Sequence, residues 1–493
     1  MSNHPPVLAY EPVIGLEVHA ELLTRSKMFC ACPVVDTTTA EPNTAVCEIC
    51  TGLPGTLPVV NARAVEFALR AALALHCTIE PASLFARKNY FYPDLPKGYQ
   101  ISQYEMPLAR NGWLDVAPPS GAKRICIRRV HLEEDTGKLF HRQGYSLVDF
   151  NRAGVPLLEI VTEPDLASLD EVRAYATSLR SVLRYLEITT GDMEKGVIRF
   201  EANVSVRPTG TTALGTRTEI KNLNSFRSML RAVAFEVERH SRLLSQGGQV
   251  LQETLRWDDG RGEAYPERGK EEADDYRYFP EPDLPPVVIG APMVESVRST
   301  LPELPDARRI RFAREYGLSD YMAGVLTAER SIADYYEAAA RSAPSAPPER
   351  LAHWLADELF GLLNLEGQAI EACRVSPQSL AELVSLVESG EINQTTGKAI
   401  LAEVFASGRS PEALIREQGL SQLSDRQAIR QLVDHVLTAY PQQVAEYRQG
   451  KSAIAQWLFG QVMRSAHGRA NPAVVRECLE AALRGPDENQ PPL

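Results

Sequence analysis

Acidic side chains recur on the polar faces of predicted strands, together with a histidine. In residues 14–22 apolar residues alternate with Glu17, His19 and Glu21, so these three side chains share one face of a β-strand. A second segment, Arg129-Val-His-Leu-Glu-Glu-Asp135, carries three acids in a row. Carboxylates beside a histidine suit Mg²⁺, which takes oxygen ligands and keeps waters for phosphate groups. The pattern therefore predicts an acidic metal site.

Two more glutamates belong to the same candidate site. Glu159 interrupts an otherwise apolar strand, and Glu201 lies on the polar face of another alternating strand. Consecutive residues of a strand point to opposite faces, so Glu133 and Glu134 cannot both face the site, and the sequence does not decide between them. The alternative to a metal site is a network of ion pairs with three arginines: Arg128, Arg129 and Arg199.

Four of the eight cysteines form two close pairs, Cys30-x-Cys32 and Cys47-x-x-Cys50. Two thiolate pairs separated by a loop predict a tetrahedral zinc site, although one residue between the first two is tighter than usual. Four protein ligands close the coordination sphere, so the role would be structural. Free thiols are the alternative. The other cysteines are predicted to be small core residues: Cys77, Cys126, Cys373 and Cys478.

Two further segments combine cations with aromatic or amide groups. The segment 87–100 interleaves Arg87, Lys88 and Lys97 with tyrosines, which suits base stacking or phosphate contacts but equally a packed surface hairpin. The segment Lys221-Asn-Leu-Asn-Ser225 precedes a predicted helix and favours either an anion site or an ordinary helix N-cap.

The predicted elements give an α+β fold with a mixed, largely antiparallel sheet. Helices are expected from the capping box Ser168-Leu-Asp-Glu171 to Leu186, from about Ser225 to Gln246, and from Asn61 to about His76. A proline-rich stretch near 280–292 ends this part, and the rest of the chain has helical patterns. Three domains are predicted: an α+β domain at 1–294, a helical domain at 295–408 and a helical tail at 409–493.

Composition limits the possible functions. The chain has 493 residues and a formal net charge of −12, which argues against broad nucleic-acid binding, although 447–476 holds five Lys/Arg and no acid. No apolar run suits a membrane span and no signal peptide precedes the fold, so a cytoplasmic protein is expected. The usual glycine-rich phosphate loops are absent, so any use of ATP needs another architecture.

Several short motifs, in order, closely resemble the B subunit of the aspartyl/glutamyl-tRNA amidotransferases. The similarity covers essentially the whole chain. The motifs are Ile14-Gly-Leu-Glu-Val-His19, Arg87-Lys-Asn-Tyr-Phe-Tyr-Pro93, Tyr99-Gln-Ile-Ser-Gln103, His131-Leu-Glu-Glu-Asp135, Glu219-Ile-Lys-Asn-Leu-Asn-Ser225, Asp275-Tyr-Arg-Tyr-Phe-Pro-Glu-Pro-Asp283, and the tail Gly460-Gln-Val-Met463 with Gly468-x-Ala-Asn-Pro472.

The resemblance implies ATP-dependent amidation of misacylated Glu-tRNA(Gln), Asp-tRNA(Asn) or both. The side-chain carboxylate is phosphorylated, and ammonia then displaces phosphate. The resemblance further implies ATP, Mg²⁺ and, in some members, zinc as cofactors. It implies an amidase-type A subunit that supplies ammonia, a small C subunit, the tRNA, and an association with a non-discriminating aminoacyl-tRNA synthetase. The Ser-Ser-Lys glutaminase segment is not in this sequence.

The family's functional residues carry over onto three groups of positions. The implied Mg²⁺ ligands are Glu17, His19 and Glu134, with Glu133, Glu159 and Glu201 nearby; Glu133 and Glu134 are also the implied catalytic acids. Lys88, Tyr90 and Lys97 are implied to line the ammonia path or phosphate site, and the implied nucleotide-binding residues are Lys221, Asn222, Asn224 and Arg199. One departure is Phe200-Glu201, where the family commonly has Cys-Asp.

Two other interpretations compete with this one. One is the archaeal E-type relative, which has an extra domain inserted near the proline-rich stretch. Here the interval 280–345 is too short to contain such a domain. A non-catalytic tRNA-binding scaffold is the alternative from a different class, and it predicts that neutralising Glu17 or Glu134 would change only local stability.

Overall fold

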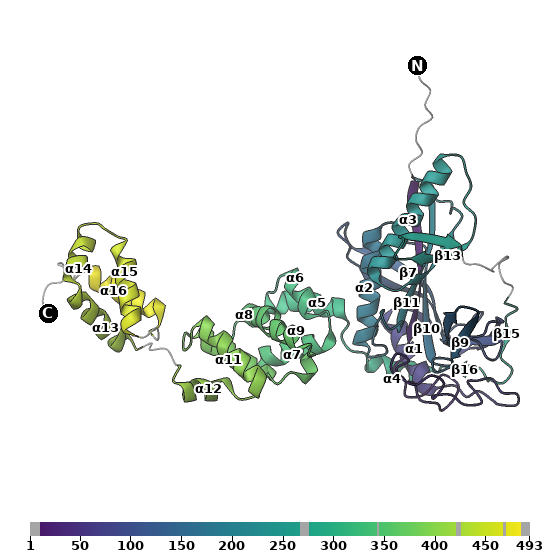
Figure 1. The fold of residues 1–493 in the computed structure, drawn as a ribbon, viewed down its shortest axis with the longest axis horizontal. Helices are drawn as coiled ribbons and strands as arrows, with labels where there is room; N and C mark the ends of the chain where they lie inside the picture. The colour runs from purple at the N-terminus through teal and green to yellow at the C-terminus, as the bar shows by residue number, and fades with distance from the viewer. Residues whose placement is uncertain (1–9, 267–275, 343–344, 421–424, 467–469, 485–493) are drawn as a thin grey trace, which may run out of the picture. The chain divides into compact units, whose positions relative to one another are not determined.

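The structure is a computed structural model that describes residues 10–266, 276–342, 345–420, 425–466 and 470–484. Asp275 and Gly468 of the motifs lie outside the described residues. The chain divides into two compact units, residues 1–304 and 305–493. Among the described residues, the first contains all the strands and the second is helical, which confirms the predicted α+β class (Figure 1).

A nine-stranded sheet organises the first unit, in the order β14-β13-β12-β11-β1-β10-β7-β6-β2. Every neighbouring pair is antiparallel except β12 and β13. Its strands are β1 (Tyr10–Glu21), β2 (Thr78–Ile79), β6 (Ala109–Val116), β7 (Lys123–Glu134), β10 (Pro156–Thr162), β11 (Ile198–Pro208), β12 (Thr218–Leu223), β13 (Thr254–Asp258) and β14 (Glu263–Pro266).

Helices α1 (Ala62–Ala74), α2 (Leu169–Tyr185) and α3 (Phe226–Ser245) share one hydrophobic core with the apolar face of this sheet. Their starts were predictable, since Asn61, Ser168 and Ser225 each accept a hydrogen bond from a first-turn N–H. The apolar residues of β1 are buried, as the alternation predicts. The opposite face of the sheet is thereby left to the polar side chains.

Short sheets complete the unit and approach the end of β7. Strand β4 (Ala86–Asn89) pairs with β5 (Tyr99–Ser102) on one side and with β15 (Phe279–Pro280) on the other, and β5 contacts β7. Helix α4 (Ala291–Ser299) contacts α1, so this unit continues past the predicted boundary at 294. The remaining pairs are β3 (Ala82–Ser83) with β16 (Val287–Val288) and β8 (Lys138–Arg142) with β9 (Tyr145–Asp149).

The second unit contains two separate hydrophobic clusters, one built by α5–α12 and the other by α13–α16. Helix α12 contacts α10 and α11, so it packs with the helices that precede it; the predicted division at 408/409 stays a prediction. In the described part of the chain, no helix is long and apolar enough to cross a membrane. The helices are α5 (Pro305–Tyr316), α6 (Asp320–Leu326), α7 (Arg330–Ser342), α8 (Pro348–His353), α9 (Phe360–Glu366), α10 (Pro377–Glu388), α11 (Gln394–Ser407), α12 (Pro411–Gln418), α13 (Arg426–Ala439), α14 (Pro441–Arg448), α15 (Ile454–Ser465) and α16 (Pro472–Arg484).

Candidate active site

Sheet register gathers acids and histidines on the polar face of four adjacent strands. Glu17 of β1 lies opposite Glu201 of β11, and His19 lies opposite Glu159 of β10. Glu159 in turn lies opposite His131 of β7. Directly opposed residues of antiparallel strands have side chains within contact distance. Residues far apart in the sequence therefore meet in one place.

The central group, which we name the carboxylate–histidine cluster, consists of Glu17, His19, His131, Glu133 and Glu159. The Nε2 atom of His19 lies 3.3 Å from Glu159, 3.6 Å from Glu17 and 3.7 Å from Glu133. The Nε2 atom of His131 lies 3.4 Å from Glu159. Two overlapping sets of three residues, both including Glu159, hold candidate ligand atoms within 4.8 Å of one another.

The donor set of this cluster fits a divalent cation. Three carboxylates supply the oxygen ligands that Mg²⁺ prefers, and two imidazoles add nitrogen donors. Within the described residues, Nδ1 of His19 and Nδ1 of His131 are buried without a hydrogen-bond partner. Three acids this close repel one another unless positive charge is present, and the guanidinium of Arg129 reaches Glu159, at 3.2 Å.

Burial and mutual repulsion shift the protonation of these groups. Burial, with the charge of Glu159, raises the pKa of Glu17 to about 7. Burial opposes charging of His19, but its hydrogen bond and charge interaction with Glu159 raise its pKa to about 9. Burial likewise opposes charging of His131, and Glu159 and Glu133 raise its pKa to about 8. The carboxylates around the two imidazoles therefore favour the charged form of both histidines.

The final two residues of β7 face different surroundings. Glu133 accepts a hydrogen bond from Ser102 at 3.1 Å and belongs to the carboxylate–histidine cluster. Glu134 is bound by the Lys97 ammonium at 2.6 Å and by the Ile101 N–H at 2.9 Å. The structure therefore brings Glu133 to the cluster and leaves Glu134, the predicted metal ligand, on the other side of the strand. Alternation in a strand that ends at Glu134 is the reason.

Lys97 and Glu134 line a hollow of about 220 Å³ that also contacts the cysteine loops. Arg87 and Tyr99 contribute to its wall, and the Arg87 guanidinium lies 4.4 Å from the Tyr99 ring centroid. The hollow and the carboxylate–histidine cluster therefore lie on opposite sides of β7, one facing Glu134 and the other facing Glu133.

Lys88 projects toward the carboxylate–histidine cluster. The ammonium of this half-buried side chain lies 4.9 Å from the ring centroid of Tyr276. Burial alone favours the neutral amine, but the charges of Glu133 and Glu159 outweigh it and raise the pKa of Lys88. Tyr90 packs among tyrosines, 6.5 Å from Tyr276 between ring centroids. Aromatic rings and a permanent cation therefore border the acidic cluster.

The predicted nucleotide-binding residues occupy three different environments. Lys221 pairs with Glu201 at 2.9 Å, beside the carboxylate–histidine cluster. Burial opposes ionisation of Glu201, but the contact with Lys221 outweighs burial and lowers the pKa of Glu201 to about 2. The amide of Asn222 donates to the Trp257 carbonyl, and Asn224 donates to Asn222. Arg199 pairs with Asp135 at 2.8 Å instead. The N-cap of the following helix is Ser225, the last residue of this segment.

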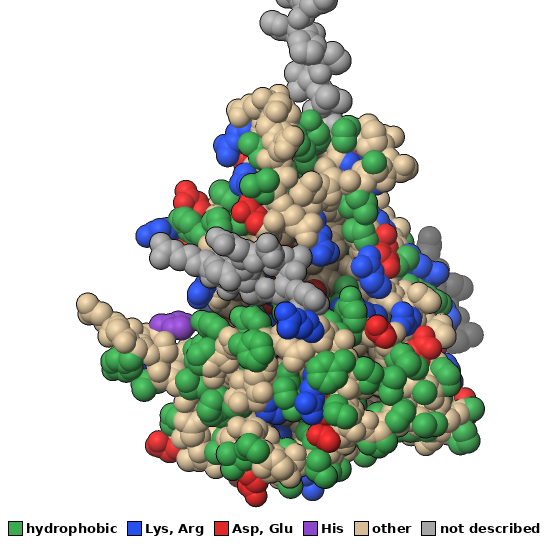
Figure 2. Space-filling model, turned by 90° about the vertical axis from the view of Figure 1, so that its right-hand side faces the viewer, with side chains coloured by type: hydrophobic (Ala, Val, Ile, Leu, Met, Phe, Trp, Pro, Cys, Tyr) green, Lys and Arg blue, Asp and Glu red, His purple; other side chains and the backbone are tan. Residues whose placement is uncertain are grey.

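The ion-pair alternative is realised in part. Arg129 contacts Glu159 of the cluster and Arg199 pairs with Asp135, while Arg128 binds Glu163 outside the cluster. Figure 2 shows a hollow near the middle of one face of the first unit, with an acidic side chain visible in its depth and Lys and Arg side chains around it. Lys and Arg side chains around a hollow attract anionic groups.

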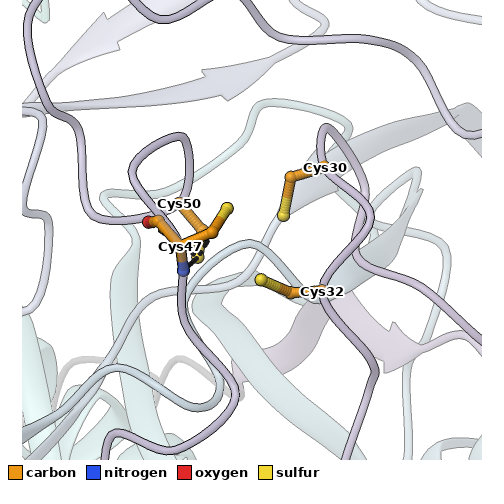
Figure 3. A group of neighbouring side chains, drawn as sticks. All are labelled: Cys30, Cys32, Cys47 and Cys50. Atoms are coloured by element: carbon orange, nitrogen blue, oxygen red, sulfur yellow. Dashed lines mark hydrogen bonds between the residues drawn. The ribbon is translucent and has the colours of Figure 1, made fainter.

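Four thiols converge at a second site, formed by two loops (Figure 3). The sulfur atoms of Cys30, Cys32, Cys47 and Cys50 all lie within 4.8 Å of one another, as a tetrahedral zinc site requires. Lys27, whose side chain is fully buried, places its ammonium 3.6 Å from Cys50 Sγ. A hydrogen bond from Cys30, together with the charge of Lys27, lowers the pKa of Cys50 to about 4 despite burial.

His131 and Lys27 were not among the predicted site residues. His131 could have been found from the sequence, because it lies two residues before Glu133 and therefore shares its strand face. Lys27 gave no such signal. It reaches the thiols only through the fold of its loop, in which its N–H donates to the Cys32 carbonyl.

Comparison with known proteins agrees with this geometry. The GatB/GatE catalytic domain family matches residues 12–295, and the GatB domain family matches residues 334–483. A protein of Geobacter sulfurreducens is 50% identical over 481 residues, which are 97% of this chain and all of that protein. One of Persephonella marina is 47% identical over 477 residues, with 97% and 100% covered. Each of these two proteins is named as the B subunit of an aspartyl/glutamyl-tRNA(Asn/Gln) amidotransferase. This chain therefore belongs to the family of the B subunits of the aspartyl/glutamyl-tRNA(Asn/Gln) amidotransferases.

Proposed function

We propose that this chain carries the activation and amidation site of a tRNA-dependent amidotransferase that uses ATP and glutamine. The observation that carries the proposal is the carboxylate–histidine cluster, bordered by the Lys88 ammonium. A protein that only binds tRNA would not require three acids packed against two imidazoles on the polar face of the sheet.

The reaction begins at the side-chain carboxylate of glutamate or aspartate esterified to tRNA. One carboxylate oxygen attacks the γ-phosphorus of ATP, the bond to the β–γ bridging oxygen breaks, and ADP leaves. The product is an acyl phosphate, whose phosphate is a good leaving group, unlike oxide. Ammonia then attacks the carbonyl carbon, phosphate departs, and one proton is lost to give the amide.

Mg²⁺ would be held by Glu17, Glu133 and Glu159, with His19 and His131 beside it. When bound, it neutralises the charge that gathers on the transferred phosphoryl group. Lys88 remains protonated because Glu133 and Glu159 raise its pKa, so it attracts the negatively charged carboxylate or phosphate. Tyr276 packs beside this ammonium and shields it from water.

The hollow containing Lys97 and Glu134 is, we infer, part of the route by which ammonia arrives. It lies across β7 from the cluster, and the largely buried ion pair of Lys97 with Glu134, at 2.6 Å, lines it. A polar, sheltered path keeps ammonia near the acyl phosphate and excludes competing water. The adjoining thiol site would bind zinc and fix the loops that wall this hollow.

Further parts of the proposal concern partners. The ammonia would come from an amidase-type A subunit, with a small C subunit in the same complex. The helical tail would hold tRNA(Gln), tRNA(Asn) or both through its acid-free stretch 447–476, by shape and backbone contacts, and a non-discriminating synthetase would deliver the charged tRNA. The reaction is proposed to be cytoplasmic.

Reconstitution with the A and C subunits tests the proposal. Charged tRNA, ATP, Mg²⁺ and either glutamine or ammonium should yield amidated tRNA, and hydroxylamine in place of ammonia should trap the acyl phosphate as a hydroxamate. Glu133→Gln should abolish both products while tRNA binding and melting temperature stay unchanged. Glu105→Gln, at an exposed position of the same unit, is the control. Full activity of Glu133→Gln would favour the scaffold alternative.

A further inference from the structure

Lys27 is a lysine whose side chain lies fully inside the protein, which is rare for this residue type. Its Nζ atom donates to the Phe150 carbonyl at 3.2 Å and to Cys50 Sγ at 3.6 Å. Among the described residues, no carboxylate forms an ion pair with this ammonium. A buried charge is costly unless an opposite charge lies beside it. The opposite charge is therefore expected on the thiol site that the ammonium contacts.

Cys50 Sγ is a sulfur atom at which hydrogen-bond donors gather. Besides the Lys27 ammonium, it accepts the N–H of Cys47 at 3.2 Å. A zinc ion bound by four thiolates leaves a net negative charge on the site. Groups that donate to the ligand atoms disperse such charge and hold the ligands in place. An ammonium and a backbone N–H on one sulfur therefore match the metal-bound form of the site.

The main chain of Lys27 belongs to the turn that carries the first pair of thiols. The Lys27 N–H donates to the Cys32 carbonyl at 2.9 Å, and the Lys27 carbonyl accepts from Asn61 Nδ2 at 3.2 Å. Asn61 is the N-cap of α1. Since the Lys27 side chain reaches Cys50 of the second pair, one residue ties both thiol pairs to each other and to the start of α1.

The same residue packs against the loop 150–154, which leads into β10. Next to Lys27, the Met28 N–H donates to the Gly154 carbonyl at 2.7 Å. Gly154 has a φ of +87°, and a Cβ at this position would lie 3.4 Å from both Lys27 Cδ and Cys50 Cβ. The loop therefore approaches the lysine and the thiol as closely as a glycine permits.

This contact reaches the hollow that contains Glu134, because Cys50 and Gly154 both line it. We propose that Lys27 balances the charge of the metal-bound thiolates and that, through Lys27, the bound metal holds the loop 150–154 in place beside the hollow. Because it requires a metal at the four thiols, this role of Lys27 rests on the proposed function. It adds the residue that completes the metal site and the wall that metal binding fixes.

Metal binding to the full-length chain tests this role without any turnover. The affinity for Zn²⁺ is measured by competition with a chromophoric chelator. Lys27→Met keeps an unbranched stem and removes the charge. It should weaken Zn²⁺ binding by roughly 10- to 100-fold, which is typical of removing a group that hydrogen-bonds a metal ligand. Lys195→Met is the matched control, since the Lys195 ammonium binds Asp36 of the loop between the thiol pairs in an exposed ion pair, at 2.7 Å.

The absorption spectrum with Co²⁺ separates a charge effect from a packing effect. Loss of the ammonium raises the energy of the sulfur lone pairs, so the sulfur-to-cobalt charge-transfer band of the Lys27→Met protein should move to longer wavelength. A lysine that acted only by packing would change the amount of bound Co²⁺ and leave the band position unchanged. The Lys195→Met protein should show the wild-type band.

Amide hydrogen exchange in the wild-type chain gives a measurement that needs no variant. Zn²⁺ should slow exchange in the loop 150–154, because the metal fixes Lys27 and the backbone that it contacts. Exchange there that is independent of Zn²⁺ overturns the link to the loop. Wild-type Zn²⁺ affinity or an unmoved Co²⁺ band in a folded Lys27→Met protein overturns the charge role. A wild-type chain that binds neither metal would refute the zinc site itself, and this role of Lys27 with it, whatever the amidation assay shows.

Discussion

The two candidate metal sites of the first unit are built in opposite ways. The four-thiol site uses residues 30–50, so its ligands lie within one pair of loops. The carboxylate–histidine cluster takes its members from β1, β7 and β10, spread over residues 17–159. The first depends on local chain geometry, whereas the second depends on the register of a whole sheet. A change in the sheet register should therefore disrupt the carboxylate–histidine cluster and leave the four-thiol site intact.

The largest expected effect follows from Glu159→Gln. This residue belongs to both ligand sets of the cluster and contacts two histidines. Removing its charge should reduce amidation with either ammonia donor by roughly 10³-fold. Zinc content, measured by atomic emission, should remain that of the wild type. A parallel loss of zinc would contradict the independence of the two sites.

The next effect separates the two sides of β7. The double change Lys97→Met with Glu134→Gln removes an ion pair without leaving one buried charge behind. Glutamine-dependent amidation should fall about tenfold, while the rate at saturating ammonium stays near the wild-type value. Lys88→Met is the matched comparison, and it should impair both donors equally because Lys88 faces the cluster. If the double variant lost activity equally with glutamine and with ammonium, the hollow would not be part of the ammonia route.

A third change tests the thiol site. Cys50→Ser should abolish zinc binding and lower the melting temperature by about 5 °C. Amidation with ammonium should retain more than about a tenth of its rate, because no cluster residue is altered. Cys126→Ser is the control, since that thiol is exposed rather than in the core as predicted, and it lies outside both sites. A metal-replete Cys50→Ser protein would show that the four thiols are not the ligands.

The smallest expected effect concerns pH. The pKa of Glu17 is raised to about 7 in the fold, so its contribution to stability is present at low pH and is lost as pH rises through that value. In magnesium-free buffer, Glu17→Gln should therefore raise the melting temperature by a few degrees at pH 8 and leave it unchanged near pH 5. Added Mg²⁺ should stabilise the wild type more than the variant. Destabilisation by Glu17→Gln at pH 8 would contradict the conclusion that burial and the charge of Glu159 disfavour the ionised form of Glu17.

Sequence periodicity predicted much of this arrangement, including the strand faces of Glu17 and Glu201 and the caps at Asn61 and Ser168. The spacing of the cysteine pairs predicted the four thiols as one group. Periodicity could not choose between Glu133 and Glu134, because the choice depends on where β7 ends. Arg199 was assigned to nucleotide binding from family likeness, but its partner Asp135 is brought to it only by the folded sheet.

The adjacent glutamates at the end of β7 give the strand one more property. Glu133 faces the cluster and Glu134 faces the hollow, so two consecutive residues supply the carboxylates of two separate sites. Most substitutions there alter one compartment, whereas inserting or deleting one residue upstream in β7 would exchange the two carboxylates. This segment should accordingly vary in its side chains far more readily than in its length.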